Sequence, residues 1–234
     1  MNRNYLRTVY FFFLHLALLG CILNSEGIRD FWGGSSLNFE SEHRHTMLRF
    51  HQRIDGNVPE NAILFFGASH VQSLSVAAIS PLTVNFGIGG DTTEGVLQRL
   101  PMYQSVARAR AIVIAVGFND LKTNDPNAIK NAVENIQEII ETMPVSASIF
   151  LSEIHPVAQM TIGADLLNKK IGQTNQQLKR LSSNYAHVDF IPLPKQLFDG
   201  HQLSNSVHIG DGIHLNEVGY QYWIDHLKKI VTAI

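Results

Sequence analysis

Short apolar runs alternate with longer amphipathic stretches from residue 61 to the end of the chain. Five of the runs are apolar almost throughout rather than at every second position, which is typical of strands buried on both faces of a parallel sheet. These predicted strands are residues 62–66, 82–86, 111–116, 148–151 and 188–191.

Between and after the last three strands, apolar residues recur at spacings of three and four. This spacing predicts helices over 129–140, 166–181 and 218–230, the first opening near Asp125 and Pro126 because proline suits the first turn of a helix. Alternating strands and helices with right-handed crossovers predict an α/β fold. We expect a three-layer α/β/α sandwich with a mainly parallel five-stranded sheet, flavodoxin-like, in one domain over residues 59–234.

The first 23 residues differ from this domain. Arg3 and Arg7 precede a 15-residue apolar run over 9–23, which is short for a transmembrane helix and typical of an export signal. Cys21 ends a Leu-Leu-Gly-Cys segment that resembles a bacterial lipobox, which predicts a lipidated N-terminus. An uncleaved anchor, simple secretion and an N-terminal core helix are the alternatives. We expect a periplasmic or membrane-anchored protein of the bacterial cell envelope.

Residues 24–58 show little periodicity until Met47, Leu48 and Phe50. They predict a tether followed by an amphipathic segment that packs on the domain.

Composition removes several classes of function. The 234 residues carry 18 Lys+Arg against 20 Asp+Glu, a net charge of -2, so there is no basic excess for nucleic acid. One cysteine can form neither an internal disulfide nor a cysteine-based zinc site.

Small and polar residues follow the predicted strands. Ligand sites in open parallel sheets form beyond the carboxyl ends of the strands, so these segments should converge on one edge. The residues there that could act in catalysis or binding are Ser69, Gly90, Asn119 and His155. Asp211 and His214, before the last helix, join them.

Ser69 is the candidate nucleophile. A serine hydroxyl needs a neighbouring base, which His214 can supply while Asp211 holds the other ring nitrogen. Alone, Ser69 could instead cap a helix with Gln72 as its partner, and the Asp211–His214 spacing could be a turn and helix cap. His208 and His155 are competing bases; His155 is predicted to line the substrate pocket, and His70 to point away from the site.

Gly90 and Asn119 can donate hydrogen bonds to an oxyanion, one from its backbone N–H and the other from its side-chain amide. Two other motifs fail: Thr92 breaks the dinucleotide pattern G-x-G-x-x-G, and Val71 breaks G-x-S-x-G. His43, His45 and His51 could bind a metal, but no carboxylate pattern accompanies them, and a solvated face is the favoured reading.

Ser69, Gly90, Asn119 and Asp211/His214, in this order and at strand ends, resemble the four sequence blocks of the SGNH (GDSL-type) hydrolase superfamily. Residues 85–100 are similar to the second block of platelet-activating-factor acetylhydrolase catalytic subunits and of bacterial lysophospholipase/thioesterase relatives. The likeness covers about residues 60–231. One position departs from it, since Ala68 stands where the family's first block usually has aspartate.

The resemblance implies an SGNH hydrolase fold and an esterase without a cofactor or metal. Ser69, His214 and Asp211 would form the triad, and Ser69 N–H, Gly90 N–H and Asn119 the oxyanion hole. The substrate would be a small-molecule, lipid or glycan ester. The alternatives are a catalytically silent module that binds glycan or lipid, which Ala68 would favour, and a flavodoxin-like nucleotide binder.

Overall fold

The computed structural model describes His15 and residues 41–231. The predicted export leader, apart from His15, and residues 24–40 of the predicted tether lie outside the described residues. From Met47 onward the chain forms one compact unit. Within the described residues, no helix is both long and apolar enough to cross a membrane.

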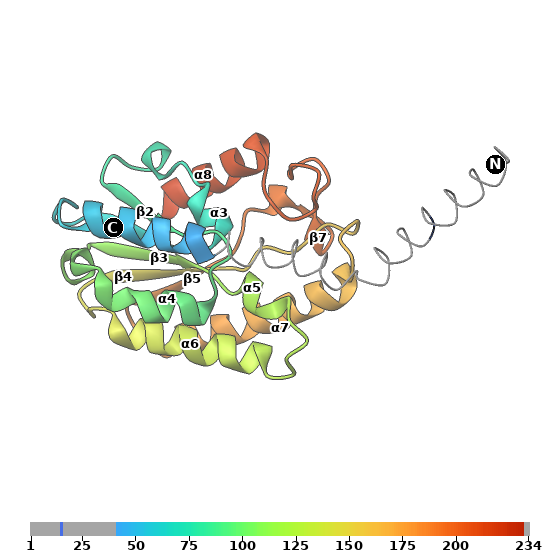
Figure 1. Cartoon of the computed structure of the whole chain (residues 1–234), viewed down its shortest axis with the longest axis horizontal. Helices are drawn as coiled ribbons and strands as arrows, with labels where there is room; N and C mark the ends of the chain where they lie inside the picture. Colours follow the sequence, from blue (N-terminus) through green and yellow to red (C-terminus); the bar gives the residue numbers. More distant parts are fainter. Residues whose placement is uncertain (1–14, 16–40, 232–234) are drawn as a thin grey trace, which may run out of the picture. The chain divides into compact units, whose positions relative to one another are not determined.

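A parallel five-stranded sheet forms the centre of this unit, with strand order β2-β1-β3-β4-β5 (Figure 1). The strands are β1 (Ile63–Gly67), β2 (Thr83–Gly87), β3 (Ala111–Ala115), β4 (Ser148–Ser152) and β5 (Val188–Ile191). All five predicted strands are present, and no end differs from its prediction by more than one residue. The predicted α/β fold class and parallel sheet are confirmed.

Helices cover both faces of the sheet. The long ones are α6 (Ala128–Thr142), α7 (Ala164–Ser182) and α8 (Glu217–Val231), close to their predicted positions, and a further helix spans 41–55. Shorter helices are α3 (Ser69–Gln72), α4 (Thr93–Arg99), α5 (Phe118–Leu121), η1 (Val76–Ala78), η2 (Leu100–Met102), η3 (Gln104–Arg108) and η4 (Lys195–Leu197). A small antiparallel pair, β6 (Phe198–Asp199) and β7 (Gln202–Leu203), follows η4.

Alternate residues of the central strands enter two separate cores. Leu64, Phe66 and Ile112 pack with apolar residues of α4, α6 and α7. Ile63 and Phe65 pack on the opposite face with residues of α8 such as Trp223 and Leu227. Side chains of a strand point alternately to its two faces, so the continuous apolar runs are explained by burial on both.

The helix over 41–55 buries two polar residues more completely than Met47, Leu48 and Phe50, the apolar residues that predicted it. Phe50 is 48% exposed, whereas His51 and Asp55 are buried. The Asp55 carboxylate accepts hydrogen bonds from the backbone amides of Gln104 (2.7 Å) and Ser105 (3.2 Å). These bonds attach the end of the helix to the segment that precedes β3.

The ends of three strands lie at the same level of the sheet. Gly67 pairs with Gly87 on one side and with Ala115 on the other, so the segments after β1, β2 and β3 leave one edge together. A Cβ atom on Gly87 would lie 2.3 Å from the backbone nitrogen of Gln72. Glycine at this position therefore allows α3 to approach the end of β2.

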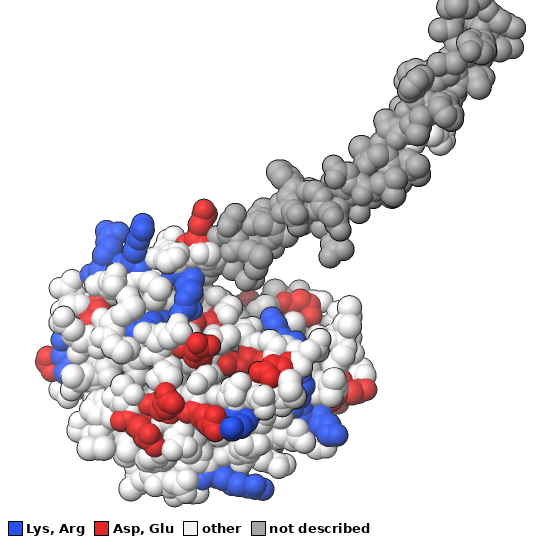
Figure 2. Space-filling model, turned by 60° about the horizontal axis from the view of Figure 1, so that its bottom comes forward, with Lys and Arg blue, Asp and Glu red and all other residues white. Residues whose placement is uncertain are grey.

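On the face that Figure 2 presents, acidic and basic side chains are interspersed among a large uncharged surface. This distribution agrees with the near-neutral composition of the chain.

Candidate active site

Ser69 is the first residue of α3 and follows the end of β1 by two positions. Its Oγ lies 3.0 Å from Nε2 of His214. The helix-cap alternative for Ser69 is wrong, because Ala68 occupies the N-cap position and the hydroxyl is bonded to the imidazole. Gln72 does not form a capping box with Ser69, and its side chain instead accepts a hydrogen bond from the amide of Gly89.

Asp211 and His214 lie in one turn ahead of α8. Nδ1 of His214 lies 2.6 Å from Oδ2 of Asp211, and Oδ1 of Asp211 accepts the backbone amides of Ile213 and His214, both at 2.9 Å. Burial acts to raise the pKa of the Asp211 carboxyl, but the hydrogen bonds from the His214 ring and from both amides outweigh it and lower the pKa to about 2. The carboxylate is therefore ionised near neutral pH and can hold the Nδ1–H tautomer of His214.

Three groups with an N–H to donate lie in the segments that follow β1, β2 and β3. Ser69 begins its helix, so its N–H has no intrahelical acceptor. Gly90 has a φ of +78°, and no acceptor for its N–H is found among the described residues. The Asn119 side-chain nitrogen, in α5, donates one hydrogen to the carbonyl of Asp91 at 2.8 Å and retains a second. The structure thus brings the regions of Gly90 and Asn119 together through Asp91.

A family model described as the GDSL-like lipase/acylhydrolase family matches residues 66–222, which include every residue placed so far in this site. The chain belongs to the GDSL-like lipase/acylhydrolase family. The resemblance inferred from the four sequence blocks is confirmed, and this acylhydrolase is an ester hydrolase.

Similar proteins include both animal and bacterial members. The alpha2 subunit of platelet-activating factor acetylhydrolase IB from Rattus norvegicus is 29% identical over 188 residues, 77% of this chain and 80% of that protein. A structure from Streptococcus pneumonia, assigned as a platelet activating factor, has a TM-score of 0.76 and 26% identity, covering 85% of this chain and 97% of that one. An acetylxylan esterase variant from Geobacillus stearothermophilus has a TM-score of 0.59 and 15% identity, covering 72% and 93%, and shows the shared fold.

A buried ion pair in the acylhydrolase supports the loop that carries Gly90, and sequence reasoning missed it. Nε of Arg99 donates to Oδ2 of Asp91 at 2.8 Å, and both side chains are almost fully buried. Nη1 of Arg99 also donates to the Tyr103 hydroxyl at 2.7 Å. Asp91 and Arg99 both lie inside residues 85–100, but two acids, Asp91 and Glu94, are available there to one arginine, so the sequence alone does not identify the buried pair.

Asp120 was also missed, although it adjoins Asn119. Its carboxylate accepts hydrogen bonds from the backbone amide and the hydroxyl of Thr93, the latter at 2.6 Å. Burial raises the pKa of Asp120, and the bonds from Thr93 oppose that shift. These contacts fasten α5 to the start of α4, so Asn119 is held by its neighbours on two helices.

Two buried histidines lie behind His214. His70 was predicted to point away from the site, but its ring lies beside that of His214, and its Nε2 donates to the carbonyl of Ile213 at 3.0 Å. The His70 ring lies 5.7 Å from the His214 ring and stacks on His155 at 4.4 Å. His155 is only 4% exposed, and its ring also forms a T-shaped contact with Trp223 at 4.7 Å, so it lies deeper than a residue at the pocket surface. Its contact with substrate stays a prediction.

His208 is not the histidine that contacts Ser69, because the Ser69 hydroxyl is bonded to His214. Its Nδ1 accepts the amides of Gly210 (3.0 Å) and Gly212 (3.1 Å), which helps to fold the turn that carries Asp211.

His51, one of the three histidines considered as metal ligands, is buried, and its Nδ1 lies 2.9 Å from the Tyr103 hydroxyl. Among the described residues, no three His, Cys, Asp or Glu side chains are grouped as metal ligands would be.

We expect the buried histidines to make the fold sensitive to acid. Burial lowers the pKa of His51 and of His70 from 6.5 to about 4, with a further lowering by Arg99 for His51. Burial, followed by the charge of His70, lowers the pKa of His155 well below 6.5. Unfolded histidines bind protons below pH 6.5 while these three stay neutral, so the free energy of unfolding should fall as the pH falls from about 7 towards 4.

Urea denaturation at pH 7.5 and pH 5 measures this effect. Each unit of pKa difference corresponds to about 1.4 kcal/mol per histidine. His155→Phe removes one of the three groups and should reduce the loss of stability between the two pH values, while His201→Asn, which replaces an exposed histidine, should not. An equal loss in wild type and His155→Phe would contradict this origin of the acid sensitivity.

Proposed function

We propose that this protein is an exported serine esterase that hydrolyses carboxylic esters through a Ser69–His214–Asp211 triad. The observation that carries the proposal is the hydrogen-bonded series from Ser69 to His214 (3.0 Å) and from His214 to Asp211 (2.6 Å), in a member of an acylhydrolase family. These distances are within the range of hydrogen bonds that transfer a proton between a nucleophile and its base.

In the first half of the reaction, Ser69 Oγ attacks the ester carbonyl carbon and His214 Nε2 takes the hydroxyl proton. The negative charge passes to the carbonyl oxygen, where the N–H groups of Ser69 and Gly90 and the amide of Asn119 donate to it. When the intermediate collapses, the bond to the alcohol oxygen breaks and His214 returns the proton to that oxygen. Asp211 stays ionised and stabilises the transient imidazolium.

In the second half, a water molecule attacks the acyl-serine while His214 takes one of its protons. The second intermediate collapses with loss of Ser69 Oγ, which regains the proton from His214. The products are an alcohol and a carboxylic acid, and neither a metal nor a cofactor is needed for either step.

The substitution at Ala68 does not remove the groups that hold the serine segment. Ala68 is 5% exposed, and its carbonyl accepts the amide of Gln72 at 2.9 Å. The neighbouring carbonyl of Gly67 accepts the amide of Ile88 at 3.0 Å. These bonds support an ordered Ser69 without the usual aspartate, and therefore favour an enzyme over a silent binding module.

The acyl group that we propose is short, either acetyl or another small acyl group, on a lipid or glycan alcohol. The names of two similar proteins support this, since one is a platelet-activating factor acetylhydrolase subunit and another is an acetylxylan esterase.

Covalent labelling tests the proposal. A fluorophosphonate probe forms a stable adduct with an activated serine, so it should label the wild-type protein and fail to label Ser69→Ala. Ser183→Ala, at the end of α7, is the matched control and should label like the wild type. Absence of labelling in folded wild-type protein would favour the silent module that binds glycan or lipid.

We also propose that the protein is anchored in the cell envelope through Cys21. Lipidation at this residue predicts that the full-length protein fractionates with membranes and that Cys21→Ser changes its processing. Mass spectrometry of the mature N-terminus and membrane fractionation measure both effects. Identical mass and identical partitioning of the two forms would exclude lipidation.

A further inference from the structure

His70 connects the segment that carries Ser69 to the turn that carries His214. It directly follows Ser69 in α3, and its side chain is buried. Its Nε2 lies 3.0 Å from the carbonyl oxygen of Ile213, which can only accept a hydrogen bond, so the proton of the neutral ring is on Nε2. The backbone carbonyl of His70 accepts the hydroxyl of Tyr220, in α8, at 3.1 Å. One residue therefore joins α3 both to the turn before α8 and to α8 itself.

The bond from His70 acts on the peptide group that sets the direction of the His214 side chain. The carbonyl of Ile213 and the N–H of His214 belong to the same planar peptide group. His70 Nε2 donates to its carbonyl end, and Oδ1 of Asp211 accepts from its N–H end at 2.9 Å. Because both ends of this plane are held, its rotation is restricted, and the Cα–Cβ bond of His214 keeps its direction towards Ser69.

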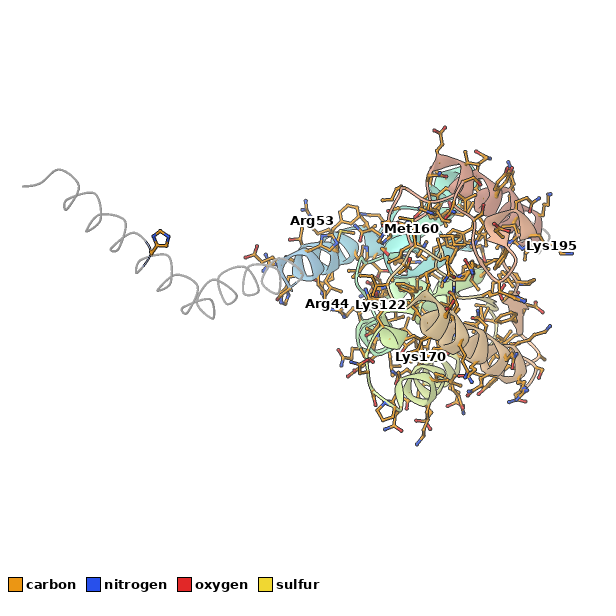
Figure 3. The ribbon with its side chains drawn as sticks, turned by 90° about the vertical axis from the view of Figure 1, so that its right-hand side faces the viewer. Arg44, Arg53, Lys122, Met160, Lys170 and Lys195 are labelled. Carbon is orange, nitrogen blue, oxygen red and sulfur yellow. The ribbon has the colours of Figure 1, made fainter. Side chains whose placement is uncertain are left out.

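A surface loop holds the same turn from the other side. Figure 3 labels Met160 of this loop, which is 60% exposed. The carbonyl of Gly212 accepts the amide of Ala158 at 2.8 Å and the hydroxyl of Thr161 at 3.3 Å. A Cβ atom on Gly212 would lie 3.1 Å from Cγ of Met160, so the loop packs directly on the turn. His70 supplies the matching contact from the interior of the domain.

The ring of His70 stacks on two other histidine rings. Its centre lies 5.7 Å from that of His214, with 29° between the planes, and 4.4 Å from that of His155, with 7° between the planes. These contacts restrict the rotation of the His70 ring and so direct its Nε2–H. Burial lowers the pKa of His70 to about 4, so the ring is uncharged near neutral pH and does not repel the imidazolium that His214 becomes during the reaction.

We propose that His70 is a positioning residue for the esterase reaction, which holds His214 Nε2 at hydrogen-bond distance from Ser69 Oγ through the Ile213 carbonyl and its stacked ring. The inference rests on the esterase function proposed above. The titratable groups that face His70 from the turn, from the segment after β4 and from α8 are His214, Asp211, His155 and Tyr220.

Two substitutions separate the hydrogen bond from the ring. His70→Gln keeps an N–H donor on a side chain of similar reach but removes the ring, whereas His70→Phe keeps a ring but removes the donor. His70→Phe should lower kcat for p-nitrophenyl acetate by roughly 10- to 100-fold, as expected for a small misplacement of a catalytic group. His70→Gln should recover most of this loss. KM should change little in either variant, because His70 is buried and acts through His214.

The pH profile and a destabilised control distinguish positioning from a structural role. The pH at half-maximal kcat/KM reports the pKa of His214. It should move to lower pH in His70→Phe, because a less fixed imidazole is held less closely to the Asp211 carboxylate, which favours its charged form. Val188→Ala is the matched control: this buried residue begins β5, at the end of the strand away from the site, so its truncation should lower the melting temperature and leave kcat and the midpoint unchanged.

A measurement on the wild-type protein does not depend on the folding of any variant. In protein labelled with ¹⁵N-histidine, NMR of the ring nitrogens should show the His70 proton on Nε2 and no titration of this ring between about pH 8 and pH 6, while His214 titrates. A proton on Nδ1 of His70, or titration of His70 in this range, would overturn the inference.

The outcomes separate this inference from the proposed function. Wild-type kcat in folded His70→Phe, or equal losses in His70→Phe and His70→Gln, would overturn the role of His70, while hydrolysis that depends on Ser69 still supports the esterase. A loss of kcat with an unchanged midpoint, reproduced by Val188→Ala, would show a structural role only and also overturn it. If the wild type hydrolyses no ester and reacts with no fluorophosphonate, the proposed function fails and this inference fails with it.

Discussion

Ser69→Ala and His214→Ala should each lower ester turnover by roughly 10⁴ or more, and the double variant should be little worse than either. The hydroxyl and the imidazole are 3.0 Å apart and act as one unit, since the serine is a weak nucleophile until the imidazole takes its proton. Removal of either partner leaves only binding and the oxyanion donors to accelerate the reaction. Removal of the second partner therefore lowers the remaining turnover only slightly.

Asp211→Asn should cost less than either of these changes. Asp211 does not touch the ester but accepts the Nδ1–H of His214 at 2.6 Å, so its loss disturbs the tautomer and orientation of a base that is still present. The same carboxylate accepts two backbone amides of its turn. Circular dichroism and thermal denaturation of each variant are therefore needed to separate an effect on the turn from an effect on the proton transfer.

A double-mutant cycle on a short-chain ester measures the coupling between Ser69 and His214. Ser183→Ala and His226→Asn are the matched controls, since they remove one serine and one histidine away from the site and should keep wild-type turnover. If the losses at Ser69 and His214 multiply, or if Ser69→Ala keeps most of its activity, the assignment is wrong.

The sheet could be predicted because its strands are apolar at successive positions, which indicates that they are buried. Strands β1 and β3 are buried at almost every position, and apolar residues at successive positions have no other stable placement than a sheet covered on both faces. The long helices α6, α7 and α8 show periodicity over 15 or more residues, which gives a strong signal.

The short elements at the site could not be predicted in the same way. Helices α3 and α5 have four residues each, about one turn, so no hydrophobic period can be seen in them. Their positions are fixed instead by contacts between distant parts of the chain, such as the bond from Asn85 Nδ2 to the carbonyl of Val71 at 2.6 Å. Sequence patterns therefore placed Ser69 and Asn119 after strands but not within helices.

Buried polar groups were the hardest to predict. Arg99 and Asp91 are charged residues that composition alone assigns to the surface, yet they are buried because each satisfies the other. The same holds for His51 and Asp55, whose partners Tyr103, Gln104 and Ser105 lie about 50 positions away. His155 was placed at the pocket because it follows a strand, while its stacking on His70 depends on tertiary packing that no local pattern shows.

Asn119→Ala should lower turnover by roughly 10²–10³ while the fold is retained, the usual loss for one oxyanion donor. Its side-chain nitrogen donates one hydrogen to the carbonyl of Asp91 at 2.8 Å, which orients the second hydrogen at no cost during the reaction. The charge on the ester oxygen is larger in the transition state than in the bound ester. The loss should therefore be concentrated in kcat, with little change in KM.

A matched control separates this role from stability. Asn127→Ala replaces an exposed asparagine at the start of α6 and should leave both kcat and the melting temperature unchanged. Gly90→Ala tests a second donor to the same oxyanion. A Cβ atom at this position has open space, but the φ of +78° is unfavourable for alanine. Any loss of turnover in this variant would therefore come from a change in the backbone of the loop. Wild-type turnover in a folded Asn119→Ala variant would remove Asn119 from the site, because a donor aimed at the developing charge cannot be deleted without raising the barrier.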